Sequence, residues 1–129
     1  MTDVQLVYHQ ASGLIATPEG QFVSIGWSGH GIGKNDPEFQ SEKSFGPLPQ
    51  GVYRVGAWEE QHPGLGPMVA HLEQIEGNNY GRDGFYFHGP AQDPSHYGNE
   101  SKGCIVVPRP GREKVREAAP EGSKVQVVA

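Results

Sequence analysis

Apolar and polar residues alternate in short runs separated by glycine and proline, and this pattern predicts a series of short β-strands. Alternation over about four to eight residues is typical of a strand with one buried face. The runs lie at residues 4–8, 14–17, 21–27, 52–58, 68–75, 85–88, 105–107 and 123–128. The run at 68–75 is also compatible with a short helix. Seven or eight such strands favour a mostly-β fold, either a sandwich or an open barrel.

The segments between these runs predict how the strands are connected. The turn signals at residues 11–13 and 18–20 join the first three runs into a β-meander. Residues 112–119 have the composition of one short helix with charged flanks. We expect residues 59–67 to form a loop. Residues 28–46 are polar and rich in glycine, without periodicity, so they predict a long loop that either covers a cleft or is a plain surface excursion.

Composition and charge narrow the class of protein. A chain of 129 residues predicts a single domain spanning 1–129, and 19 glycines with 11 prolines argue against a helical bundle. The net charge of -5, without any cluster of Lys and Arg, argues against nucleic-acid binding. No segment approaches the length of a membrane span. Residues 1–5 lack the basic and apolar regions of an ordinary secretory signal.

Two side chains suggest a nucleophilic enzyme. Cys104 is the only cysteine, so it forms no internal disulfide, and it precedes the run at 105–107. His88 ends the aromatic run at 85–88. A thiol becomes an efficient nucleophile when a base or a positive field stabilises the thiolate, and histidine titrates in the suitable range. One loop separates the two residues, so neighbouring strands would bring them together. A small buried side chain is the alternative for a lone cysteine.

Residues next to this pair have a place in the same chemistry. Gly89 allows close backbone approach, and its carbonyl oxygen is placed to orient the His88 imidazole through the far ring nitrogen. Gly103 frees the backbone before the nucleophile, which suits an oxyanion hole of main-chain N–H groups. Ser101 either hydrogen-bonds within this motif or is an ordinary turn serine.

The segments 46–53, 81–89 and 101–107 carry a family resemblance. They read Gly-Pro-Leu-Pro-Gln-Gly-Val-Tyr, Gly-Arg-Asp-Gly-Phe-Tyr-Phe-His-Gly and Ser-Lys-Gly-Cys-Ile-Val-Val. The paired His-Gly and Ser-x-Gly-Cys motifs resemble the signature of the L,D-transpeptidase catalytic domain. Together the segments are most similar to the small L,D-transpeptidase-like effectors of type VI secretion. The resemblance covers roughly residues 26–110, and the paired motif is its specific part.

The resemblance implies an L,D-transpeptidase-like β fold, with the short helix after the catalytic cysteine. Cys104 would attack the L,D-amide before the terminal D-alanine of a peptidoglycan tetrapeptide stem, at diaminopimelate. His88 would be the base, and Gly89 would orient it. Water as acceptor gives an L,D-carboxypeptidase, a D-amino acid gives exchange, and a second stem gives a crosslink. The thiol mechanism needs no cofactor and no metal.

The resemblance also implies partners and a place of action. The substrate would be the peptidoglycan tetrapeptide stem, and the partners would be an immunity protein and components of a secretion apparatus. We expect a monomer that neither binds nucleic acid nor inserts into a membrane. It would be made in the bacterial cytoplasm without a signal peptide and would act in the periplasm of a target cell.

Two positions depart from the pattern of the broader family. Lys102 stands where histidine is usual, and Val106 stands where arginine is frequent. The effector branch is looser at both positions, so the departures favour that branch over a housekeeping crosslinking enzyme. They leave open how the substrate carboxylate is held. The candidate substrate-binding residues are Lys102, Arg82, Tyr80, His96 and Arg109.

Other readings of the same residues remain open. His88, His96 and Cys104 would supply three ligands to a catalytic zinc ion, although no short motif such as His-Glu-x-x-His is present. A papain-like peptidase would place its cysteine before its histidine, and here the order is reversed. A non-catalytic wall-binding or phage structural module would need no cysteine–histidine pair. Thiol reactivity and metal content distinguish these readings.

Overall fold

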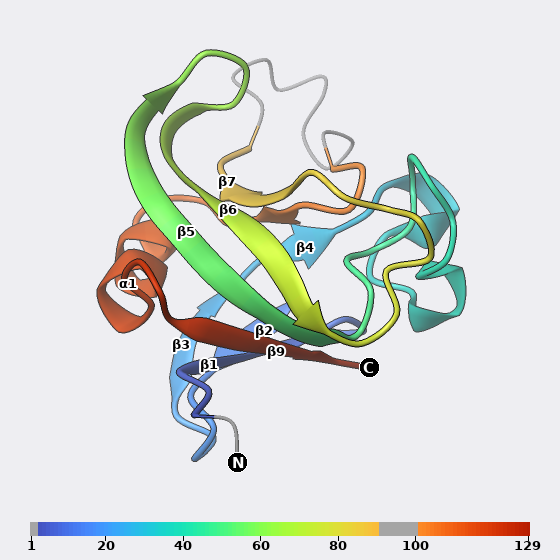
Figure 1. Cartoon of the computed structure of the whole chain (residues 1–129), viewed down its shortest axis with the longest axis horizontal. Coiled ribbons are helices and arrows are strands. Elements are labelled where there is room, and N and C mark those ends of the chain that lie inside the picture. Colours follow the sequence, from blue (N-terminus) through green and yellow to red (C-terminus); the bar gives the residue numbers. More distant parts are fainter. Residues whose placement is uncertain (1–2, 91–100) are drawn as a thin grey trace.

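The computed structural model describes residues 3–90 and 101–129, which form a single twisted sheet with one α-helix at its side (Figure 1). Within these residues the sheet has nine strands in the order β3-β2-β1-β9-β5-β6-β7-β8-β4. The strands are β1 (Leu6–His9), β2 (Leu14–Ala16), β3 (Phe22–Ile25), β4 (Trp27–Ser28), β5 (Gly51–His62), β6 (Gly66–Glu76), β7 (Phe85–His88), β8 (Ile105–Val106) and β9 (Lys124–Val128). The helices are the 3-10 turns η1 (Gly31–Gly33) and η2 (Pro37–Phe39) and the α-helix α1 (Gly111–Ala118).

The two ends of the sheet are consecutive in the chain, so the sheet curls into a nearly closed barrel. β3 and β4 lie at opposite ends of the strand order and only Gly26 separates them. A side chain at position 26 would overlap the backbone oxygen of Val106, which explains the glycine. The run at 21–27, expected to be one strand, is therefore two strands. The predicted mostly-β fold with one short helix is confirmed, in its barrel-like form.

The predicted β-meander is confirmed at the start of the chain. β1 pairs antiparallel with β2, and β2 pairs antiparallel with β3. The closing strand β9 lies between β1, to which it is parallel, and β5, to which it is antiparallel. The last residues of the chain thus join the meander to the rest of the barrel (Figure 1).

The hairpin of β5 and β6 is longer than the sequence predicts. Residues 59–67 were expected to form a loop, but β5 continues to His62 and β6 begins at Gly66. Glu59 to Gln61 are polar and exposed, because this part of the hairpin extends beyond the core, and they carry no alternation to detect. The run at 68–75 lies within β6, so the strand interpretation is correct and the helical alternative is wrong.

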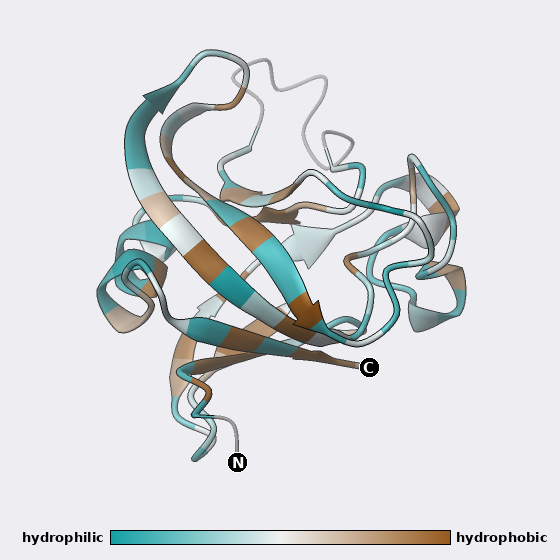
Figure 2. Cartoon of the chain, viewed as in Figure 1, coloured by the Kyte–Doolittle hydropathy of each residue, from teal (hydrophilic) through white to brown (hydrophobic). Residues whose placement is uncertain are grey.

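The core fills the barrel and the space under α1. Inward-facing side chains of β5 and β6 alternate with outward-facing polar ones, and Figure 2 shows this alternation along both strands. The predicted helix at 112–119 is confirmed as α1, and Val115 is buried against the core. α1 has eight residues, and no helix in the described part of the chain is long and apolar enough to cross a membrane.

Candidate active site

His88 and Cys104 lie on the same face of two neighbouring strands. β7 and β8 are parallel, with Phe87 opposite Ile105 and His88 opposite Val106. One step back, this register places Cys104 opposite Tyr86. Side chains alternate along a strand, so Cys104, Tyr86 and His88 share the face that points away from the core. Strand spacing and rise put the Cα atoms of His88 and Cys104 roughly 8 Å apart, so their side chains extend over the same area of the sheet.

The main chain fixes the orientation of the His88 imidazole. His88 is only 4% exposed, and its Nδ1 lies 2.8 Å from the carbonyl oxygen of Gly89. A carbonyl oxygen only accepts, so Nδ1 carries the proton and Nε2 is the basic nitrogen. This is the contact that the sequence predicted for Gly89. A side chain at position 89 would overlap the Arg112 guanidinium, which gives the glycine a second reason.

The thiol of Cys104 is held in its neutral form. Burial raises its pKa to about 11, and a backbone hydrogen bond from Tyr86 and the positive charge of Arg82 offset only part of that rise. Sγ lies 3.7 Å from the carbonyl oxygen of Gly84. The thiol is therefore protonated at neutral pH in the resting site, and a nucleophilic role for Cys104 would require a base to remove that proton.

Ser101 organises the turn that presents Cys104. The Ser101 hydroxyl is fully buried and donates to the Cys104 carbonyl oxygen at 2.6 Å. It accepts from the N–H groups of Gly29, at 2.9 Å, and Gly103, at 3.2 Å. Ser101 thus hydrogen-bonds within the motif, as one of the two readings expected. The N–H of Gly103 is engaged inside the turn in this conformation, which leaves the expected oxyanion hole without structural support at that atom.

Gly103 has a backbone conformation that only glycine adopts readily. Its φ angle is +124°, and a Cβ there would lie 2.6 Å from Arg82 Nη2 and 2.8 Å from Phe85 Cε1. The turn is therefore packed directly against a buried guanidinium and a core aromatic ring. Close packing therefore requires a glycine before Cys104, in addition to the backbone freedom inferred from the sequence.

Residues from the segment 28–46, which was expected to be a long loop, and Leu48 just after it form hydrogen bonds around this turn. Ser28 Oγ donates to the Gly103 carbonyl oxygen at 3.1 Å, and His30 Nδ1 lies 2.7 Å from the Ser101 carbonyl oxygen. The Leu48 N–H donates to Ser28 Oγ at 2.7 Å. Ser28 and His30 therefore contact the turn that carries the thiol, whereas residues 41–44 of the same segment are exposed.

Arg82 was expected among the residues that hold a substrate carboxylate, but its surroundings argue for a structural task. It is 5% exposed and donates to four backbone carbonyl oxygens. Those oxygens belong to Gln40, Gly46, Pro47 and Lys102. Four of its five N–H donors are thus used to join residues 40–47 to the turn that precedes Cys104.

The other expected substrate-binding residues lie at separate places. Lys102 is exposed, one residue from the Gly103–Cys104 pair. Arg109 is exposed, with Nε 3.8 Å from Glu113 Oε2, next to the start of α1. Tyr80 is 38% exposed and lines a cavity with η2 residues. His96 lies outside the described residues, so the three-ligand zinc reading stays a prediction. In the described part of the chain, no three His, Cys, Asp or Glu side chains gather as a metal site.

Three residues of this face were not among the expected site residues. The Tyr86 ring lies edge-on to His71, with ring centroids 5.1 Å apart, and to His62, at 5.3 Å. His71 pairs with Tyr86 across β6 and β7, so these rings continue the row that ends at Cys104. Alternation along the run Phe85-Tyr86-Phe87-His88 puts Tyr86 and His88 on the same face, so this pattern is the sequence signal that could have identified Tyr86.

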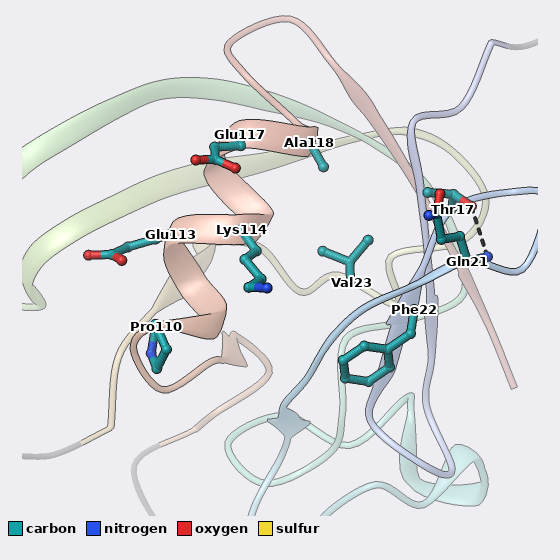
Figure 3. A pocket seen from close by; sticks show the side chains of 9 residues that line it. All are labelled: Thr17, Gln21, Phe22, Val23, Pro110, Glu113, Lys114, Glu117 and Ala118. Carbon is teal, nitrogen blue, oxygen red and sulfur yellow. Dashed lines mark hydrogen bonds between the residues drawn. The ribbon is translucent and has the colours of Figure 1, made fainter.

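Two cavities flank the Cys104–His88 pair. One, of about 170 Å³, is lined by Gly84 together with residues of β6 and of the segment 79–85. The other, of about 220 Å³, is lined by Gly89, Pro90, Arg109, Arg112 and residues 65–67. A larger cavity of about 560 Å³ lies between α1 and the β2–β3 hairpin, and Figure 3 shows its lining side chains. Neither His88 nor Cys104 lines any of the three cavities, but the two smaller ones are lined by residues that contact the pair. The Gly89 carbonyl oxygen holds His88 Nδ1 and the Gly84 carbonyl oxygen lies 3.7 Å from Cys104 Sγ, so we place the candidate site next to these two cavities.

Comparisons with known proteins agree with this fold. A family model described as the Tlde1 domain matches residues 23–129. No curated protein sequence matches the chain significantly. Solved structures match closely in shape at low identity, so they bear on the fold alone.

Three of these structures illustrate the similarity. An L,D-transpeptidase from Mycobacterium tuberculosis H37Rv has a TM-score of 0.61 at 18% identity, over 96% of this chain and 57% of its own. The C442S mutant of an Enterococcus faecium L,D-transpeptidase gives 0.62 at 16%, over 99% and 50%. The helical cell shape determining protein Pgp2 of Campylobacter jejuni gives 0.60 at 17%, over 95% and 46%. The chain spans about half the length of these relatives.

Proposed function

This chain belongs to the Tlde1 domain family of L,D-transpeptidase-like type VI effectors, and from that premise we propose that it is a peptidoglycan-modifying cysteine enzyme. It acts on the tetrapeptide stem, as an L,D-carboxypeptidase, as an L,D-transpeptidase that exchanges D-amino acids, or as both. The observation that carries the proposal is the shared face of His88 and Cys104, with His88 Nδ1 held by the Gly89 carbonyl oxygen.

The geometry supports a general-base mechanism with a neutral resting thiol. His88 Nε2 takes the proton of Cys104 as Sγ attacks the carbonyl carbon of the amide between diaminopimelate and D-alanine. The tetrahedral intermediate collapses, the C–N bond breaks, and the imidazolium returns the proton to the departing amine of D-alanine. Water or the amine of an acceptor then attacks the thioester, and Cys104 is released as a thiol.

Purified tetrapeptide muropeptides provide the test. We expect the full chain to convert them to tripeptides with release of D-alanine, and to incorporate a labelled D-amino acid when one is supplied. Cys104→Ala should abolish both products. The exposed Glu121→Gln variant, far along the chain from the site, is the matched control and should keep them. Tetrapeptides that remain unchanged, or equal turnover by Cys104→Ala, would contradict the proposal. Binding to peptidoglycan without turnover would favour the wall-binding module.

We propose the same reaction as the basis of an antibacterial role. The domain would act on the wall from the periplasm of a target cell, and an immunity protein would protect the producing cell. Directing the chain to the periplasm of a test bacterium with an added signal sequence should cause lysis or rounding, while cytoplasmic production should not. Toxicity that persists in Cys104→Ala would separate the effect from this chemistry and contradict the role.

A further inference from the structure

The cavity beside Gly89 contains a buried positive charge, and no acidic side chain in the part of the chain that the structure describes forms an ion pair with it. The charge belongs to Arg112, which is 4% exposed. Nη1 donates to the Val107 carbonyl oxygen at 2.8 Å and Nη2 to that of Pro67 at 3.4 Å. Burial and the nearby charge of Arg109 lower the pKa of Arg112, and the negative charge of Glu113 offsets only part of that change. A buried charge of this kind is costly unless an anion or further hydrogen bonds compensate it.

One donor of this guanidinium has no acceptor at all. Arg112 Nε is buried and has no hydrogen-bond partner among the described residues. Buried donors are almost always satisfied, and an exception in a functional region calls for a missing partner. Arg112 and Arg109 both line the cavity of about 220 Å³, where residues 65–67 and Gly89 supply the remaining wall. Glu113 is occupied by its ion pair with Arg109 on the exposed side.

The cavity is adjacent to His88 through a single residue, Gly89. The Gly89 carbonyl oxygen holds His88 Nδ1, and the Gly89 Cα packs against the Arg112 guanidinium so closely that no Cβ would fit. Three bonds, C–N, N–Cα and Cα–C, separate the scissile carbonyl carbon from the terminal carboxylate carbon. Their summed length is about 4.3 Å. An anchor for that carboxylate must therefore lie next to the base and the nucleophile. The cavity volume of about 220 Å³ is roughly that of seven molecules of liquid water, which is enough for the end of a D-alanine residue.

We propose that Arg112, assisted by Arg109, binds a carboxylate of the peptide stem in this cavity. Arg112 offers a planar fork that is already held in place by two carbonyl oxygens, so little side-chain freedom is lost on binding. The inference rests on the proposed function for the identity of the ligand. The anion site itself rests on the buried, unneutralised guanidinium and the cavity.

Direct observation of the Arg112 Nε–H group tests the site independently of turnover. We would titrate ¹⁵N-labelled Cys104→Ala protein with N-acetyl-D-alanine and, in parallel, with N-acetyl-D-alaninamide, which lacks the carboxylate. Disappearance of one Nε–H signal in Arg112→Lys assigns the resonance. We expect a saturable shift of that signal with the acid only. No shift with any carboxylate, or equal shifts with acid and amide, would overturn the proposal.

Variants and a second ligand pair complete the test. Arg109→Gln is exposed and should weaken binding of the acid a few-fold, and Arg112→Lys should weaken it about ten-fold. Tripeptides with free and amidated diaminopimelate distinguish the two carboxylates of the stem, since a shift confined to the free form would assign that group. If the wild-type chain fails to turn over tetrapeptides while the shift with N-acetyl-D-alanine is present, the proposed reaction fails and the anion site stands.

Discussion

The protonation state of Cys104 can be measured directly, and the structure predicts it. Burial raises the pKa of the thiol to about 11. At pH 7.5 a thiol with that pKa is about 0.03% ionised, against about 10% for an ordinary cysteine with a pKa of about 8.5. The thiolate population is then about 300-fold smaller. A thiolate of higher pKa is intrinsically more nucleophilic, by about 10- to 20-fold over this interval. We therefore expect alkylation to be about 20-fold slower than for a free cysteine.

Iodoacetamide alkylation followed by intact-protein mass measures this quantity between pH 6 and 10.5. The logarithm of the rate should rise by about one per pH unit through pH 10, because the thiol stays largely protonated over that range. The same chain unfolded in urea is the matched control and should show an inflection near the ordinary value. Circular dichroism at each pH verifies that the barrel stays folded.

A second variant decides between a neutral thiol and a preformed ion pair. His88→Gln should leave the alkylation profile nearly unchanged while it abolishes turnover of muropeptides, because His88 acts only when substrate is present. A rate that levels off below pH 8 in the wild-type protein would refute the reasoning. So would a profile that His88→Gln moves to higher pH, since both results indicate a thiolate–imidazolium pair in the resting site.

Two further predictions concern the turn that presents the thiol. Gly103→Ala should lower the free energy of unfolding by about 3 kcal/mol and abolish turnover, because the positive φ angle and the contacts with a buried guanidinium and ring both oppose a Cβ. Gly20 is the control: its φ angle is +94°, and nothing lies within 4 Å of a Cβ there. Gly20→Ala should therefore lower the free energy of unfolding by only about 1 kcal/mol in the same denaturant titration. Ser101→Ala should lower the free energy of unfolding by about 2–4 kcal/mol, because two N–H groups and one carbonyl oxygen lose their hydrogen-bond partner. Ser12→Ala, at an exposed turn, is the control and should change the free energy of unfolding by less than about 1 kcal/mol. Equal losses in the two serine variants would contradict the role of Ser101.

The sequence predicted the elements that have a local cause. Alternating runs bounded by glycine or proline became strands, because each buries one face against its neighbours within the barrel. The motif at 101–104 and the His88–Gly89 pair could be proposed from sequence because the chemistry suggested for them depends on residue type and short spacing. The contact between His88 Nδ1 and the Gly89 carbonyl oxygen also followed, since it joins consecutive residues.

The parts that sequence could not predict depend on contacts between distant residues. Gly26 divides one apolar run into two strands because the sheet closes there, and closure is a property of the whole chain. The outer half of the β5–β6 hairpin has no buried face, so it shows no alternation. Ser28 and His30 contact the turn that carries Cys104, yet nothing in the composition of their segment indicates which residues they contact.

The two buried arginines show why position in the fold matters more than charge in choosing a ligand-binding residue. Arg82 lies in the segment that resembles the family, which made it the natural candidate, but four of its donors are taken by backbone carbonyl oxygens. Arg112 stands in a helix that looked ordinary, with charges on both sides. It has two such bonds, an unsatisfied Nε and a cavity beside it. Arg82 uses four of its five donors to hold the fold together, whereas Arg112 uses two and keeps three that can bind an anion.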